Sequence, residues 1–194
     1  MSKVAVFEYY PDTSHIKLNL PNGEKTEIEI NPGWAFGKGN HPTTKLCIQA
    51  LEKIFKEGNV KTALDVGCGS GVLSIASAAL GAEHIVGVDI DNAITLEANS
   101  NTEKNGFSSK INIVLGSVED VPGEFDLVVA NILIDSILAI SEELIKRTSP
   151  SGTILLSGIK GEQKQRAINR FTELGYKLEE VFSENEWVAL VFKQ

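Results

Sequence analysis

The sequence predicts an α/β fold: a doubly wound, seven-strand, mostly parallel sheet with a small amino-terminal β appendage. From about residue 60 onward, short apolar runs alternate with helical segments, the pattern of parallel strands joined by crossover helices. The first of these runs leads into a glycine-rich turn at residues 67–71 and then into a helical run of small residues. The last two runs form a hairpin, which adds one antiparallel strand to the sheet.

The composition is that of a globular domain. The chain has 194 residues, 42% of them hydrophobic and 23% charged, which is enough for one domain with a real core. We expect a β appendage at residues 1–30 and the main domain at residues 31–194. A net charge of −8 without any basic run disfavours direct binding of nucleic acid.

Other broad classes are also disfavoured. No stretch approaches ~18 apolar residues, and the amino terminus lacks the pattern of a signal peptide. We therefore expect no membrane partner and a cytoplasmic location. The cysteines, Cys47 and Cys68, are too few for a disulfide scaffold or a zinc cluster, and no metal site is predicted.

The amino-terminal residues are predicted to form strands. Residues 4–10 are apolar and aromatic, and residues 15–20 and 26–30 alternate between apolar and polar side chains. The turn 21–23, which contains Asn-Gly, separates the two alternating runs, and this combination indicates a hairpin.

Residues 31–44 form a segment without strand or helix periodicity. Glycines, a histidine and two aromatic side chains, Trp34 and Phe36, make it an expected functional loop that closes over a site and excludes water; alternatively, the aromatics pack on the core. His41 is a candidate general base or a structural residue. A helix is predicted over residues 43–56, and a threonine hydroxyl at its start can cap it or reach a ligand, with Thr44 as the residue expected to reach the ligand.

The glycine turn, residues 67–71, marks a ligand site. Alternate glycines, Gly67 and Gly69 first, let a ligand approach the backbone at the start of a helix. A dinucleotide-binding turn requires a glycine where Val72 stands, so this spacing disfavours a nicotinamide cofactor. Asp65 would repel a pyrophosphate but accept hydrogen bonds from an ammonium or a backbone amide.

A second acidic residue follows at the end of the next apolar run. Asp89 comes about 20 residues after the glycine turn, where α/β nucleotide sites place the carboxylate that binds ribose hydroxyls. The alternative is that Asp89 or Asp91 only caps the helix that begins near Asn92. Both roles are compatible, with Asp89 on ribose and Asp91 as the cap.

The rest of the chain continues the same alternation. We expect a helix over 92–104, a strand over 110–115, a strand over 125–130, a helix over 133–147, a strand over 153–157 after a turn at 149–152, a helix over 161–174, and a hairpin of 176–182 with 186–192. Ser117 follows the third strand of the sheet, where an adenine edge would lie. Asn131 ends the fourth strand and either contacts the ligands or caps the helix after it.

Several motifs together resemble one family. Residues 65–71 read Asp-Val-Gly-Cys-Gly-Ser-Gly, which resembles motif I of class I S-adenosylmethionine (SAM) methyltransferases. The segments that resemble the ribosomal protein L11 methyltransferases, of the PrmA type, are 32–44, 65–71, 87–91, 129–133, 156–159 and 186–190. Lys38 stands where that family usually has threonine. The family's additional amino-terminal domain, which recruits the ribosomal protein, is expected to be absent, because only some 30 residues precede the resemblance.

The resemblance implies a SAM-dependent N-methyltransferase that acts on amino groups of a protein, ribosomal protein L11 first. It implies that Asn131 orients the reacting amine and also contacts the cofactor. The other implied cofactor-binding residues are Phe36, Thr44, Asp65, Gly67, Gly69, Asp89 and Ser117. The alternatives are a methyltransferase for another protein or a small amine, a SAM-binding module without catalysis and, in another class, an NAD-dependent oxidoreductase.

Overall fold

The computed structural model describes residues 11–31 and 33–194. The predicted strand at residues 4–10 lies outside these described residues. The predicted fold class is confirmed: a seven-stranded sheet has the order β5-β4-β3-β6-β7-β9-β8, and a separate two-stranded sheet pairs β1 with β2. The order reverses direction between β3 and β6, which is the arrangement of a doubly wound sheet.

The strands are β1 Ser14–Asn19, β2 Lys25–Ile30, β3 Thr62–Val66, β4 His84–Asp89, β5 Ile111–Leu115, β6 Phe125–Asn131, β7 Thr148–Lys160, β8 Lys177–Glu184 and β9 Trp187–Lys193. The helices are α1 Pro42–Glu57, α2 Val72–Leu80, α3 Asn92–Lys104, α4 Ile134–Ala139, α5 Ser141–Lys146 and α6 Lys164–Glu173. Two short 3-10 helices span Val118–Asp120 and Gly161–Gln163.

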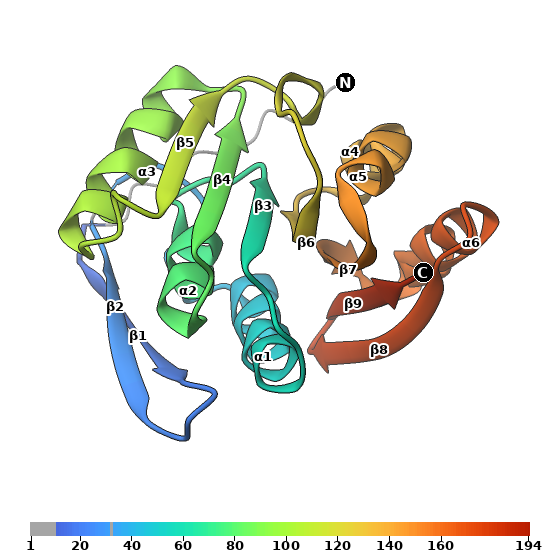
Figure 1. Ribbon diagram of the computed structural model, residues 1–194, viewed down its shortest axis with the longest axis horizontal. Coiled ribbons are helices and arrows are strands. Elements are labelled where there is room, and N and C mark those ends of the chain that lie inside the picture. Colours follow the sequence, from blue (N-terminus) through green and yellow to red (C-terminus); the bar gives the residue numbers. More distant parts are fainter. Residues whose placement is uncertain (1–10, 32) are drawn as a thin grey trace.

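Helices cover both faces of the sheet. Figure 1 shows α1, α2 and α3 on one side and α4, α5 and α6 on the other. Strands β3 to β7 pair in parallel, whereas β9 runs antiparallel to both of its neighbours. Most side chains of the central strands β3 and β6 are apolar, as expected where helices bury a sheet from both sides. No helix in the described part of the chain is long and apolar enough to cross a membrane.

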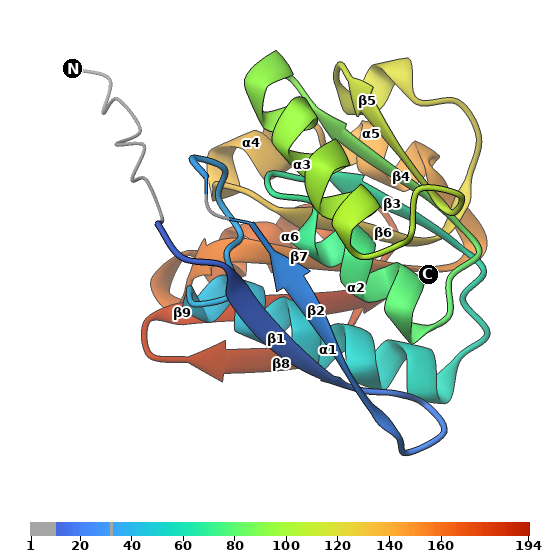
Figure 2. The same cartoon turned by 90° about the vertical axis from the view of Figure 1, so that its left-hand side faces the viewer.

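The amino-terminal hairpin lies outside the helical layer. Figure 2 shows β1 and β2 in front of α1 and α2, with α3 beside them. The Asn-Gly turn was predicted correctly, and Gly23 at its tip has a φ of 88°. Leu18, Ile28 and Ile30 are buried and join the same core cluster as α1 and α2. The hairpin therefore shares its core with the main body, while the domain division after residue 30 stays a prediction.

Three local predictions were wrong. The helix expected over 133–147 is broken at Ile140, where the backbone (φ −104°, ψ 11°) ends α4 and begins α5 and the Ser141 hydroxyl donates to Leu138 O. The turn expected at 149–152 belongs to β7, which meets β6 with an irregular register there. The hairpin of β8 and β9 is present as predicted, but its turn lies at Asn185 and Glu186 instead of 183–185, and Asn185 adopts a φ of 55° there.

Candidate active site

The glycine turn, residues 67–71, joins β3 to α2 at the carboxyl edge of the sheet. All three of its glycines have positive φ, including 71° at Gly67 and 55° at Gly69, which side chains rarely adopt. The Gly67 N–H donates to Val88 O at 2.8 Å and ties the turn to β4. A Cβ on Gly69 would lie 2.6 Å from Phe36 O, so only glycine permits this contact with the loop above.

Asp65 is a buried carboxylate beside that turn, with 3% of its surface exposed. Its Oδ2 accepts hydrogen bonds from the Ser74 N–H at 3.0 Å and the Ser74 hydroxyl at 2.7 Å. Burial raises the pKa of Asp65 from 3.8 to about 6, although the bonds from Ser74 oppose this shift. A cation near the carboxylate would relieve the cost of burying its charge.

Asp89 ends β4 and faces the same turn. Its Oδ2 accepts from the Gly69 N–H at 3.1 Å, and its Oδ1 accepts from the Asp91 N–H at 3.2 Å. Asp91 caps α3 by accepting from the Ala93 N–H at 2.8 Å, which confirms the predicted cap. Asp89 therefore does not cap α3, and its contact with a ribose stays a prediction.

The segment that precedes α1, residues 33–41, lies on the glycine turn, and we call it the pocket loop. Phe36 O accepts from the Ser70 N–H at 2.9 Å, and Gly37 O accepts from the Ser70 hydroxyl at 2.7 Å. The Phe36 side chain is 46% exposed, so it does not pack in the core. Its ring meets His41 edge-on, with centroids 5.1 Å apart.

The start of α1 brings His41 and two threonines to this edge. His41 Nδ1 accepts from the Thr43 N–H at 3.3 Å and caps the helix, which is the structural one of its two predicted roles. Partial burial lowers the pKa of His41, against a smaller opposing effect of Glu186. The Thr44 hydroxyl is buried without a hydrogen-bond partner among the described residues. The alternative that a threonine hydroxyl caps the helix is therefore wrong, because the His41 side chain does so, and the role of Thr44 on a ligand stays a prediction.

Asn131 ends β6 beside Asp65. Its Oδ1 is buried, and no hydrogen-bond partner for it exists within residues 11–31 and 33–194. The alternative that Asn131 caps the next helix is wrong, because α4 begins at Ile134 and has Leu133 at its cap position. A buried carbonyl oxygen without a hydrogen-bond donor lowers the stability of the fold, so a ligand that supplies a donor to this atom would bind favourably.

A small pocket gathers the predicted residues Phe36, Asp65, Gly67, Gly69 and Asn131. Asp89 meets this group through Gly69, whereas Ser117 does not line it and is bonded to Asp120 through its N–H at 2.8 Å. The lining residues that sequence reasoning missed are Gly37, Cys68, Val72 and Leu73. Gly37 and Cys68 lie within the motif segments 32–44 and 65–71, and Val72 and Leu73 directly follow the second of these, which is the signal that could have found them. Burial raises the pKa of the Cys68 thiol, so its sulfur is neutral.

The chain is similar to known proteins along nearly all of its length. The family model of ribosomal protein L11 methyltransferase (PrmA) matches residues 11–194. A ribosomal protein L11 methyltransferase of Exiguobacterium sp. is 43% identical over 175 residues, which are 90% of this chain and 55% of that relative. One from Bacillus pumilus is 40% identical over 168 residues, covering 86% of this chain and 53% of the relative. The chain thus spans about half the length of the curated relatives it matches.

Solved structures show the same likeness. The crystal structure of a ribosomal protein L11 methylase from Lactobacillus delbrueckii subsp. bulgaricus has a TM-score of 0.78 and 32% identity, with 85% of this chain and 83% of that chain covered. A 16S rRNA methyltransferase from T. thermophilus has a TM-score of 0.71 at 21% identity, with 94% of this chain and 50% of that chain covered, and it shares the fold. By its matching motifs, its fold and its relatives, this chain belongs to the ribosomal protein L11 methyltransferase (PrmA) family.

Proposed function

We propose that this chain is a SAM-dependent N-methyltransferase that acts on amino groups of a protein, with ribosomal protein L11 as the first acceptor to test. One observation carries the proposal: the buried Oδ1 of Asn131 lacks a donor among the described residues, in a pocket that also holds Asp65 and the glycine turn. An oxygen in that position is suited to accept a hydrogen bond from an amine.

The pocket residues suit SAM. Asp65 favours the ammonium of the methionine end, and its raised pKa reflects a buried carboxylate that lacks a cationic partner among the residues described. Asp89 favours the ribose hydroxyls. The Thr44 hydroxyl, which has no hydrogen-bond partner in the described part of the chain, favours the polar atoms of the methionine end. Ser117 is proposed for the adenine edge. When bound, SAM would supply a methyl group on a positively charged sulfonium sulfur.

The remaining work of the site is positioning. The acceptor amine must be neutral to act as a nucleophile, and a lysine amine in water titrates near ~10.4. We propose that Asn131 Oδ1 accepts a hydrogen bond from this amine and thereby aims its lone pair into the pocket. The Phe36 ring, at the outer wall, would exclude water from the reacting groups.

The names of the relatives support the choice of acceptor. The Exiguobacterium, Geobacter metallireducens and Lactobacillus proteins are named for action on ribosomal protein L11. We further propose that residues 31–194 are the methyltransferase domain, that residues 1–30 form its appendage, and that the chain works in the cytoplasm where its acceptor is made. Acidity and the absence of a basic run favour a protein acceptor over nucleic acid.

The test is transfer of labelled methyl from SAM into purified ribosomal protein L11, with a whole-cell extract in parallel. We expect label in the ribosomal protein and a loss of about 100-fold in the transfer rate for Asn131→Ala, because an orienting hydrogen bond is removed. SAM binding by this variant, measured by calorimetry, should remain detectable. Label in a different extract band would replace the acceptor but keep the reaction. SAM binding without any label would favour a binding module instead.

A further inference from the structure

A buried ion pair connects the pocket loop to helix α3. Lys38 comes from the loop and Glu97 from α3, and their side chains are only 2% and 16% exposed. Lys38 Nζ also donates to Asn31 O at 2.9 Å, so the ammonium is held on two sides. Because burying two charges seldom adds net stability compared with apolar side chains, such a pair suggests a positional role.

The Glu97 carboxylate binds more of the loop than Lys38 alone. Its Oε2 accepts from the backbone N–H groups of Trp34, at 2.9 Å, and Ala35, at 3.1 Å. Gly33 makes room for it, because a Cβ there would lie 2.2 Å from a Glu97 carboxylate oxygen. One carboxylate thus fixes the loop at three donors on its α3 side.

The opposite side of the loop is fixed by the glycine turn through Ser70, as described above for Phe36 and Gly37. Asn101 of α3 links the glycine turn to the residue before the loop: its Nδ2 donates to Ser70 O at 2.9 Å, and its Oδ1 accepts from the Asn31 N–H at 2.8 Å. Phe36, whose carbonyl accepts from the Ser70 N–H, directly follows the two backbone donors that Glu97 binds, and it lines the pocket. The position of this pocket wall therefore depends on contacts that come from α3.

We propose that Lys38 and Glu97 are positioning residues for the pocket: their ion pair holds residues 33–38 against the glycine turn, so that Phe36 covers bound SAM and slows its release. The identity of the ligand rests on the proposed function. Removal of either charge leaves the other buried without its partner, which drives the loop away from the turn. Neither residue contacts the reacting atoms, so both act through the position of Phe36.

Three variants break the pair in different ways. Lys38→Met removes the ammonium, Glu97→Gln removes the negative charge, and Gly33→Ala displaces the carboxylate without changing any charge. The matched control is Lys53→Met, which breaks the exposed ion pair between Lys53 on α1 and Glu180 on β8. Unfolding midpoints confirm that each variant is folded. If a charge variant does not fold, Gly33→Ala tests the ion pair in its place.

The first measurement is amide hydrogen exchange in the ligand-free protein. We expect the protection of the Ser70 N–H, which donates to Phe36 O, to fall at least about tenfold in the three variants. The β6 amides and the Lys53→Met control should match the wild type. Unchanged protection of Ser70 in all three folded variants would overturn the proposal, because the loop would then be held without the ion pair.

The second measurement is the Kd and the dissociation rate of SAM and of its demethylated product, S-adenosylhomocysteine. We expect a Kd at least about tenfold higher in each variant, mainly through faster dissociation, because the pocket wall is released. If the variants bind SAM as tightly as the wild type does, although their Ser70 N–H has lost its protection from exchange, the positioning role is wrong. If the wild type binds neither compound, the proposed function fails and the role toward SAM fails with it, while the exchange data still decide whether the pair holds the loop.

Discussion

The two ends of the paired strands β3 and β6 are built differently. At the amino end, Asp126 accepts from the backbone N–H groups of Lys61 and Thr62, both at 2.9 Å, and its own N–H donates to Thr62 Oγ1. At the carboxyl end, Asn131 Oδ1 has no partner among the described residues, and Asp65 carries a raised pKa.

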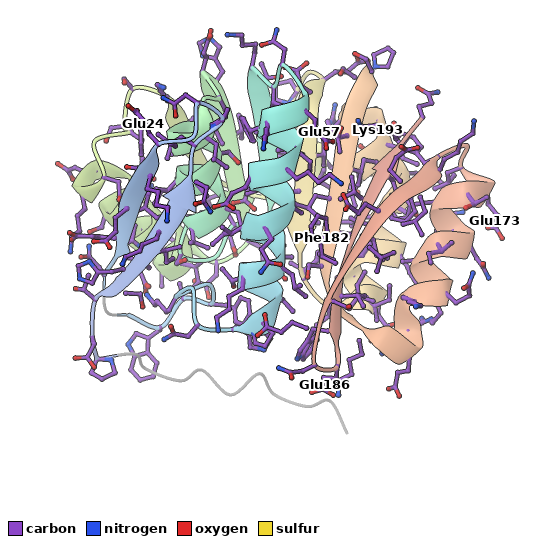
Figure 3. The ribbon with its side chains drawn as sticks, turned by 90° about the horizontal axis from the view of Figure 1, so that it is seen from below. Glu24, Glu57, Glu173, Phe182, Glu186 and Lys193 are labelled. Atoms are coloured by element: carbon purple, nitrogen blue, oxygen red, sulfur yellow. The ribbon has the colours of Figure 1, made fainter. Side chains whose placement is uncertain are left out.

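Figure 3 helps to place these two edges: Glu57 and Lys193, where α1 and β9 end, lie at the amino edge, and Glu186, next to the start of β9, lies at the opposite one. The amino end of the strand pair satisfies its polar groups internally, as a structural contact must. The carboxyl end leaves polar groups open, which costs stability unless a ligand supplies the partners. On the proposed function, the same two strands therefore serve stability at one end and binding at the other.

The largest effect is expected at the glycine turn. Gly69→Ala should weaken SAM binding about 100-fold, because its Cβ would meet Phe36 O at 2.6 Å and push the pocket loop away. Gly106→Ala is the matched control, since Gly106 also has positive φ but open space around its Cβ. Calorimetry should show an unchanged Kd for the control, with only about 1 kcal/mol lost from the free energy of unfolding. Equal binding by both variants would contradict the role of the turn.

The next effect concerns the carboxylate at the end of β4. Asp89→Asn should raise the Kd for SAM about 10- to 100-fold, because a charged acceptor is lost while an oxygen remains for the Gly69 N–H. Asp126→Asn makes the same chemical change at the other edge and should leave the Kd unaltered. A similar loss of binding in both variants would show that the effect arises from general destabilisation.

The pH dependence of binding sharpens the contrast through Asp65. Its pKa is raised from 3.8 to about 6, so below about pH 6 the ligand-free site gains a proton that the ammonium of SAM must displace. The affinity should therefore fall as the pH falls through 6, by up to about tenfold per pH unit. In Asp65→Asn this part of the profile should be flat; a profile equal to that of the wild type would exclude Asp65 as its source.

The raised pKa of Asp65 affects the stability of the ligand-free protein in the opposite direction to SAM affinity. Between pH 3.8 and about 6, the folded state holds more protons on Asp65 than the unfolded chain does. The contribution of Asp65 to the free energy of unfolding therefore rises as the pH falls through this window. Denaturant unfolding of the wild type and Asp65→Asn across the window measures this difference.

The smallest effect is expected at the amino end of β3 and β6. Asp126→Ala should lower the free energy of unfolding by about 1 kcal/mol, because two backbone N–H groups lose their acceptor near the surface. Urea unfolding measures this loss, and the Kd for SAM should stay within about twofold of the wild type. A large change in binding would mean that the two ends of the strands are not independent.

Most of the fold could be predicted from local patterns. The β3 to α2 turn, the helix Asn92–Lys104 and the Asn-Gly hairpin follow from glycine conformation, capping and alternation, which depend on near neighbours in the chain. The break at Ile140 could not be predicted, because the apolar pattern of 133–147 continues through it. It is stabilised by contacts from elsewhere, such as the Arg170 Nε that donates to Ser141 Oγ at 2.8 Å.

The residues of the candidate site could be predicted from the sequence, but the hydrogen bonds that their polar atoms make could not. The motifs indicated Asp65, Gly69 and Asn131, and the structure brings them into one pocket. They could not indicate which polar atoms stay without partners, because a threonine or an asparagine is as often a cap as a ligand contact. The capping role predicted as an alternative for a threonine at the start of α1 is in fact filled by His41.

The alternation of strands and helices, the glycine turn and the acidic residues at the strand ends follow from the amino-acid sequence alone, because they depend on side-chain periodicity and local backbone conformation. The pairing of Lys38 with Glu97, 59 residues further along the chain, and the lack of a donor to Asn131 among the described residues arise only in the folded molecule. Such pairings depend on distances in space after the strands have aligned, and no local pattern in the chain encodes those distances.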